Sequence, residues 1–263
     1  MRPNKLRELL KAGKPTLSTH IHTTWPSVVE VLGHTGLYDY VEFVVEYGSH
    51  DGTHDFDNMA RAAELYNMGT MIKVDQSQQA YLAQRAIGSG FSSVLFTDCR
   101  SAADARECVR SVRPDTPEDK GLYGVAMRRH CYMGYGGTKE YVQALRDTVV
   151  MLMIEKKGAV DELEEVLSIP GVDMVQWGGS DFSMSIGRAG ERKHPDVEAA
   201  RIKTFKTALR MGKHPRAEIG SPDDAKEYLD MGVRHFSIGT DIAVLFGYWK
   251  ANGEKLRKAM EGA

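Results

Sequence analysis

Short apolar segments recur along this chain, and segments with helical periodicity separate them. The apolar segments are rich in Val, Ile and Phe and do not alternate strictly with polar residues. This pattern is typical of parallel strands that are buried on both faces. The predicted strands are residues 17–21, 40–45, 70–74, 93–96, 149–154, 174–177 and 235–238.

The segments between the strands predict helices. Residues 163–167 and 202–209 place apolar side chains on one helix face. Ser221, followed by Pro222, is typical of a helix N-cap, and Ser101 resembles the first residue of a capping box. Strands and helices therefore alternate along the chain.

This alternation over 263 residues, without a linker, predicts one α/β domain spanning residues 1–263. Seven clear strands and a weaker one at residues 216–219 fit a (β/α)8 TIM barrel, whose typical length is about 250 residues. A doubly wound open sheet is the alternative, but no Gly-x-Gly-x-x-Gly motif follows an early strand. The dense glycine cluster at residues 134–137 is predicted to be a loop.

Composition excludes several classes of protein. The chain has 34 Lys and Arg against 36 Asp and Glu, so we expect no nucleic-acid partner. The longest apolar run, residues 149–154, is far shorter than the ~20 residues that span a bilayer, so no membrane partner is expected. Three cysteines without Cys-x-x-Cys spacing predict neither a disulfide framework nor a structural zinc site, and they favour a cytoplasmic location.

Two carboxylates mark a candidate site. Active sites of such barrels lie at the C-terminal ends of the strands. Glu155 and Asp181 directly follow consecutive predicted strands, so they should be neighbours. Paired carboxylates suit a hard divalent cation such as Mg²⁺. The structural alternative is an N-cap acid at Asp181 and an ion pair at Glu155.

Residues 171–187 resemble the signature of the class II pyruvate aldolases of the HpcH/HpaI family, GVDG-hydrophobic-x-GPADLS-x-x-x-G. The segment ending at Glu155 and residues 194–197 and 239–241 match further family segments. The resemblance implies a barrel of the phosphoenolpyruvate/pyruvate type. It also implies that Glu155 and Asp181 hold Mg²⁺, Mn²⁺ or Co²⁺, and that the chain forms homo-oligomers, trimers or hexamers, that swap the last helix.

The resemblance implies a metal-dependent carbon–carbon lyase that acts on a small 2-oxo acid. In such enzymes the metal chelates the carboxylate and keto oxygens and stabilises an enolate. Backbone amides near Gly179 and Ser180 would complete the substrate site. Retro-aldol cleavage and decarboxylation are the expected reactions.

The chain departs from the family in the residues that transfer protons. Where the family has Asp-x-Glu-His after the second strand, this chain has Val44, Glu46 and Tyr47 at the Asp, Glu and His positions. Tyr is a poor base at neutral pH because its ordinary pKa is near 10. Lys73 aligns with the family's arginine and supplies charge without the planar fork. We expect Lys73 to contact the enolate or carboxylate of the substrate.

Histidines offer a substitute for the missing base. His20 and His22 alternate along the first strand and share one face. His20 aligns with a tryptophan that lines the family's pocket, and imidazole groups titrate near neutral pH. Proton transfer is therefore assigned to His20, Tyr47 or a metal-bound water, with His22 contacting substrate. His50 and His54 are further candidates.

Two other functions stay open from the sequence. A metal-dependent hydrolase could use His20 and His22, as amidohydrolase barrels do, although the fifth and sixth strands lack the histidines that such a site needs. A non-catalytic, ligand-binding descendant is favoured by the lost base dyad and opposed by the retained Glu155 and Asp181.

The chain end carries an unusually apolar segment, residues 242–249. It suits a helix that docks on, or swaps with, a neighbouring subunit, and packing against its own barrel is the alternative. Residues 128–130, Arg-Arg-His, are predicted to form a solvated or subunit-contact loop.

Overall fold

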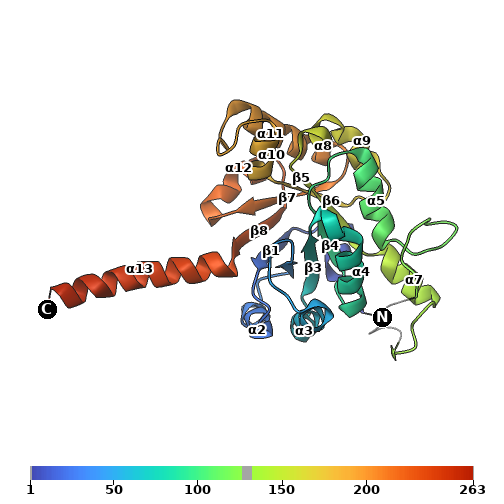
Figure 1. The fold of residues 1–263 in the computed structure, drawn as a ribbon, viewed down its shortest axis with the longest axis horizontal. Helices are drawn as coiled ribbons and strands as arrows, with labels where there is room; N and C mark the ends of the chain where they lie inside the picture. Colours follow the sequence, from blue (N-terminus) through green and yellow to red (C-terminus); the bar gives the residue numbers. More distant parts are fainter. Residues whose placement is uncertain (1, 126–131, 263) are drawn as a thin grey trace.

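The strands form a closed parallel barrel (Figure 1). The computed structural model describes residues 2–125 and 132–262, and within these ranges eight strands follow one another around the barrel in sequence order. All the predicted strands are confirmed, including the weak one at residues 216–219. The strands are β1 (Thr16–Ile21), β2 (Tyr40–Val44), β3 (Gly69–Val74), β4 (Ser93–Phe96), β5 (Val149–Ile154), β6 (Met174–Trp177), β7 (His214–Ile219) and β8 (His235–Thr240).

Helices follow the strands and surround the barrel (Figure 1). Short 3-10 turns, η1 (Gln76–Gln78) and η2 (Pro222–Asp224), precede two of them. The helices are α1 (Lys5–Lys11), α2 (Pro26–His34), α3 (Gly52–Leu65), α4 (Gln79–Ser89), α5 (Ala102–Val112), α7 (Lys139–Arg146), α8 (Lys157–Asp161), α9 (Leu163–Ser168), α10 (Gly179–Ser185), α11 (Pro195–Arg210), α12 (Ala225–Asp230) and α13 (Asp241–Glu261).

Both predicted N-caps are confirmed. The Ser101 hydroxyl accepts a hydrogen bond from the Asp104 backbone N–H at the start of α5. Ser221 and Asp224 form a capping box around η2, which leads into α12. Caps of this kind satisfy backbone N–H groups that have no partner within the helix, so local sequence alone indicates where these elements begin.

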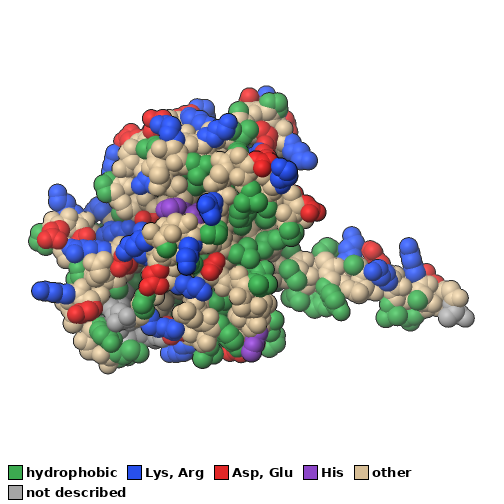
Figure 2. Space-filling view, turned by 180° about the vertical axis from the view of Figure 1, so that it is seen from behind, with side chains coloured by type: hydrophobic (Ala, Val, Ile, Leu, Met, Phe, Trp, Pro, Cys, Tyr) green, Lys and Arg blue, Asp and Glu red, His purple; other side chains and the backbone are tan. Residues whose placement is uncertain are grey.

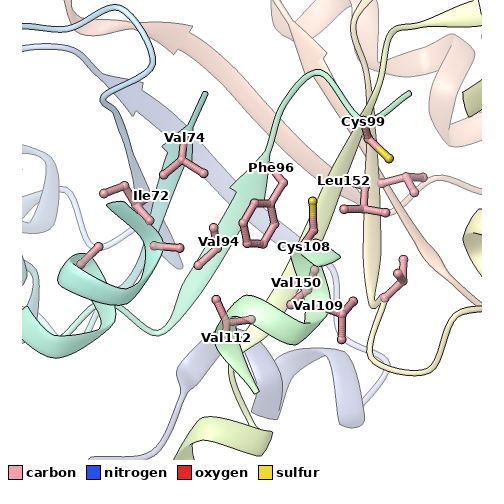
Figure 3. Packing of buried hydrophobic residues seen from close by; sticks show 14 of the residues in the cluster. Ile72, Val74, Val94, Phe96, Cys99, Cys108, Val109, Val112, Val150 and Leu152 are labelled. Carbon is pink, nitrogen blue, oxygen red and sulfur yellow. The ribbon is translucent and has the colours of Figure 1, made fainter. Parts of the chain in front are cut away.

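The main hydrophobic core lies between the strands and the helices. Outward-facing side chains of β3, β4 and β5 pack in one cluster with apolar side chains of α4 and α5 (Figure 3). Cys99 and Cys108 are buried in this core as free thiols. The labelled members of this packing are Ile72, Val74, Val94, Phe96, Cys99, Cys108, Val109, Val112, Val150 and Leu152.

The interior of the barrel changes from apolar to polar along the strands. Along β2 to β6 the inward side chains near the strand starts are apolar, and α1 closes this end with Leu6 and Leu10. Because side chains alternate, the next inward position lies two residues further along each strand. Met71 is followed in this way by Lys73, and Met174 by Gln176. The C-terminal end of the barrel is therefore lined by polar groups.

The last helix, α13, extends away from the barrel instead of packing against it (Figure 1). In Figure 2 hydrophobic side chains lie along one edge of the helix, and Lys and Arg lie along the other. The alternative of packing against its own barrel is therefore wrong, whereas docking on a neighbouring subunit stays a prediction. The exposed large apolar residues are Ile242, Val244, Leu245, Phe246, Tyr248, Trp249, Leu256 and Met260.

Two of three smaller expectations can be compared with the structure. Residues 134–137 lie outside helices and strands, as predicted. The predicted contact loop at residues 128–130 lies outside the described residues. Across the part of the chain that the structure describes, no helix is both long and apolar enough to cross a membrane. The cytoplasmic location stays a prediction.

Candidate active site

Glu155 lies directly after β5, and its side chain turns into the barrel with only 3% of its surface exposed. Its Oε1 accepts a hydrogen bond of 2.8 Å from the Asp98 backbone N–H. Burial, together with the negative charge of Asp181, raises the pKa of Glu155 to about 7, although the Asp98 N–H opposes this shift. A side chain at position 178 would overlap Glu155 Oε2, so Gly178 provides the space for this carboxylate.

A lysine joins the second predicted ligand to the same cluster. Asp181 lies in the first turn of α10, and its Oδ1 accepts a hydrogen bond of 3.0 Å from Lys156 Nζ. The same ammonium group lies 2.7 Å from Asp98 Oδ1. Asp98 has a φ of 57°, a conformation that is uncommon outside glycine. The ends of β4, β5 and β6 are thus connected through Asp98, Lys156 and Asp181.

The donor set fits a hard divalent cation. Mg²⁺ is usually bound by one or two carboxylates and keeps several waters. Burial and the charge of Asp181 raise the pKa of Glu155 even though Lys156 and Lys73 lower it, so the cations of the chain do not fully compensate this carboxylate. Among the residues described, no group of three or more His, Cys, Asp or Glu side chains could hold a metal. The chain would therefore supply the Glu155 and Asp181 carboxylates, and the other ligands would be water or substrate.

Lys73 projects into the polar end of the barrel from β3. Its Nζ lies 2.6 Å from Glu46 Oε2, and both side chains are largely buried. Although burial alone would lower it, the charge of Glu46, followed by those of Glu42 and Glu155, raises the pKa of Lys73. Lys73 therefore stays cationic close to Glu155, as the substrate contact predicted from the sequence requires.

Tyr47 follows Glu46 and is 82% exposed at the rim. The charge of Glu46, with smaller effects of burial and of Asp181, raises the pKa of Tyr47 above its ordinary value. A higher pKa makes the phenol a still weaker base at neutral pH. The catalytic role of Tyr47 stays a prediction.

His20 lies inside the barrel between two carboxylates. Its Nε2 is 3.4 Å from Glu42 Oε1, and its Nδ1 is 3.7 Å from Glu218 Oε1. Glu42 forms an ion pair with Arg216, and neither side chain has any exposed surface. Although burial alone would raise it, the charges of Arg216, His20 and Lys73 lower the pKa of Glu42.

Hydrogen bonds extend this buried ion pair across the barrel. Arg216 donates to Gln176 Oε1 at 2.6 Å and to the Tyr40 hydroxyl at 3.1 Å. Gln176 in turn donates to Glu218 Oε2 at 2.8 Å. This network was not predicted from the sequence. Its signal was the presence of Glu42 and Arg216 at inward positions of strands that are otherwise apolar.

The other residues predicted for the site are three histidines and two residues of α10. The His22 ring lies at the mouth of the barrel, with Nδ1 3.4 Å from Asp241 Oδ1. His50 packs against Phe56, and His54 is exposed in α3. The contacts of these three rings therefore differ from those of His20, which faces Glu42 and Glu218. Gly179 and Ser180 lie in the first turn of α10 beside Asp181, and their role in binding substrate stays a prediction.

Comparison with known proteins relates this geometry to a family. The model of the HpcH/HpaI aldolase/citrate lyase family matches residues 25–246. A hydroxypyruvate/pyruvate aldolase of Paraburkholderia phytofirmans is 27% identical over 243 residues, which cover 91% of this chain and 92% of that protein. A 4-hydroxy-2-oxo-heptane-1,7-dioate aldolase of Shigella boydii is 26% identical over 245 residues, with coverages of 92% and 90%.

The structural similarity covers the same barrel. An HpcH/HpaI aldolase/citrate lyase family protein from Burkholderia cenocepacia matches this structure with a TM-score of 0.85 and 26% sequence identity. The match covers 97% of this chain and 100% of that chain. Glu155 and Asp181 both lie within the residues that the family model matches.

Proposed function

The chain belongs to the HpcH/HpaI aldolase/citrate lyase family, and from this premise we propose that it is a divalent-metal-dependent carbon–carbon lyase acting on a 2-oxo acid. The observation that carries the proposal is the position of Glu155 and Asp181 at the ends of neighbouring strands, where burial and like charge raise the pKa of Glu155. Mg²⁺, Mn²⁺ or Co²⁺ would be held by these two carboxylates.

The residues around the carboxylates can bind and orient a 2-oxo acid. When bound, the metal supplies Lewis-acid polarisation of the keto group. The first N–H groups of a helix have no partner within it, so those of Gly179 and Ser180 can donate to the substrate carboxylate. The ammonium group of Lys73 adds positive charge where negative charge develops on the keto oxygen during carbon–carbon cleavage. His22, at the mouth of the barrel, would contact the distal part of the substrate.

Proton transfer is assigned to the His20 ring. Imidazole groups are common proton-transfer groups in enzymes, and this ring lies between the Glu42 and Glu218 carboxylates. The buried ion pair with Arg216 keeps Glu42 in place beside the ring. This arrangement provides an acid–base group in a chain that has Val44 and Tyr47 where the family's motif has Asp and His.

The alternative functions receive less support. A hydrolase that used both His20 and His22 would need the two rings to converge on one ion, but they face different carboxylates, Glu42 and Asp241. A non-catalytic descendant is opposed by the retained metal carboxylates and by the aldolase relatives.

A homo-oligomer, as trimer or hexamer, would cover the apolar edge of α13.

A retro-aldol assay tests the proposed function. A 4-hydroxy-2-oxo acid is incubated with the full chain and Mg²⁺, Mn²⁺ or Co²⁺, and released pyruvate is measured with lactate dehydrogenase and NADH. We expect pyruvate release that stops with EDTA and is lost in Glu155→Gln, whereas the exposed Glu191→Gln control keeps it. Release that continues undiminished in EDTA and in Glu155→Gln would contradict the proposal.

A further inference from the structure

Lys156 occupies a position that no feature of the proposed reaction explains. Its ammonium group bridges Asp98 Oδ1, at 2.7 Å, and Asp181 Oδ1, at 3.0 Å. Lys156 directly follows Glu155 after the end of β5, and its side chain is 13% exposed. The ammonium group of Lys156 therefore forms an ion pair with Asp181, one of the two carboxylates that are proposed to bind the metal.

The carboxylates around Lys156 carry more negative charge than its ammonium group neutralises. Asp98, Glu155 and Asp181 supply three carboxylates, and Lys156 supplies one ammonium group. Two negative charges remain when these four groups are ionised, because Lys73, the other cation near Glu155, is paired with Glu46. Exposed Arg100, 4.0 Å from Asp98, is a more distant cation. Removing Lys156 would leave a more negative site, which attracts a divalent cation more strongly.

We propose that Lys156 competes with the divalent cation for Asp181 and lowers the metal affinity of this site. In the metal-free protein the ammonium group holds Asp181, and when the cation binds, the ammonium group moves entirely onto Asp98. The shorter of its two contacts already joins it to Asp98, so this movement keeps its charge paired. This inference rests on the metal site proposed above.

Calorimetric titration of Mn²⁺ into the full chain tests this competition without reference to catalysis. We expect Lys156→Met, which removes the charge and keeps an unbranched side chain, to bind Mn²⁺ roughly tenfold more tightly than the original chain, because the competing charge-assisted hydrogen bond is gone. Lys157→Met is the matched control, since Lys157 pairs with exposed Asp161 on the neighbouring turn. Its affinity should stay unchanged.

A second variant predicts a change of opposite sign. Asp98→Asn removes the carboxylate that would receive the displaced ammonium group, so Lys156 should hold Asp181 more firmly and Mn²⁺ should bind roughly tenfold more weakly. In the Lys156→Met background the same change should weaken binding less. Thermal unfolding followed by circular dichroism confirms that each variant is folded.

The outcomes separate this inference from the function on which it rests. If the original chain binds Mn²⁺ and Lys156→Met binds it equally or more weakly, the competition is contradicted. The proposed metal site is then still supported. An equal effect of Asp98→Asn in both backgrounds would contradict the competition as well. If neither the original chain nor Lys156→Met binds Mn²⁺, the metal site and the competition fail together.

Discussion

The buried carboxylate of Glu155 links the stability of the metal-free protein to pH. Burial and the charge of Asp181 raise its pKa from 4.5 to about 7. For a group whose pKa is raised on folding, the associated stability is fully present below the unfolded pKa and is lost as the pH rises through the folded pKa. In the metal-free protein this loss falls between about pH 4.5 and pH 7.

Glu155→Gln should therefore stabilise the metal-free protein in a pH-dependent way. The amide oxygen can still accept the Asp98 N–H, but no charge is buried. We expect the free energy of unfolding in urea to exceed that of the original chain by about 2 kcal/mol at pH 8, with little difference near pH 4.5. The exposed Glu191→Gln variant is the control. A difference that is the same at both pH values would contradict the assignment.

Lys73 is expected to act on the reaction through its charge. Lys73→Met should lower kcat of the retro-aldol reaction by about 10²-fold, as the loss of one oxyanion-stabilising group typically does. Because Glu46 then loses its ion-pair partner, unfolding is measured alongside to separate stability from catalysis. The exposed Lys206→Met variant should retain full turnover. Turnover in folded Lys73→Met equal to that of the original chain would refute this role.

The strands show what the sequence could and could not predict. Long apolar segments such as β5 were recognised directly, because a strand buried on both faces has few polar residues. β7 gave a weak signal because Arg216 and Glu218 interrupt its apolar character. The partner of Arg216 is Glu42, 174 residues away in the chain. Only the closure of the barrel brings these two side chains together, so local patterns could not predict the pair.

The same distinction applies to the candidate site. Glu155 and Asp181 could be predicted because each directly follows a strand and each matches the family's signature. Lys156 and Asp98 were visible at strand ends, but their bridge to Asp181 depends on the φ of Asp98 and on the path of a long side chain. Family resemblance could not indicate these contacts, because they arise from side-chain placement in the folded barrel.

The ion pair between β2 and β7 should be important for the stability of the barrel. Arg216→Met would leave the Glu42 carboxylate buried without its partner, and we expect a loss of about 3–5 kcal/mol in the free energy of unfolding. The double variant Arg216→Met/Glu42→Gln removes both charges and should regain most of this loss. Urea unfolding measures both variants. A single variant as stable as the original chain would show that the pair contributes little.

In the whole molecule, a monomeric barrel does not account for the exposed apolar side chains of α13. Phe246 and Trp249 are both 65% exposed on this projecting helix. We expect the chain to form trimers or hexamers at micromolar concentration, with a mass that light scattering coupled to gel filtration can measure. Phe246→Glu/Trp249→Glu should reduce that mass, whereas Lys255→Glu should leave it unchanged. A monomeric original chain would contradict this expectation.

Formation of an enolate from a 2-oxo acid at a metal held by Glu155 and Asp181 is most directly tested by hydrogen exchange of pyruvate. Pyruvate is incubated in D₂O with the full chain and Mg²⁺, and loss of its methyl proton signal is followed by NMR. We expect exchange well above the buffer rate, stopped by EDTA and lowered at least about 10²-fold in Asp181→Asn. Exchange no faster than in buffer, or exchange unaffected by both EDTA and Asp181→Asn, would contradict this mechanism.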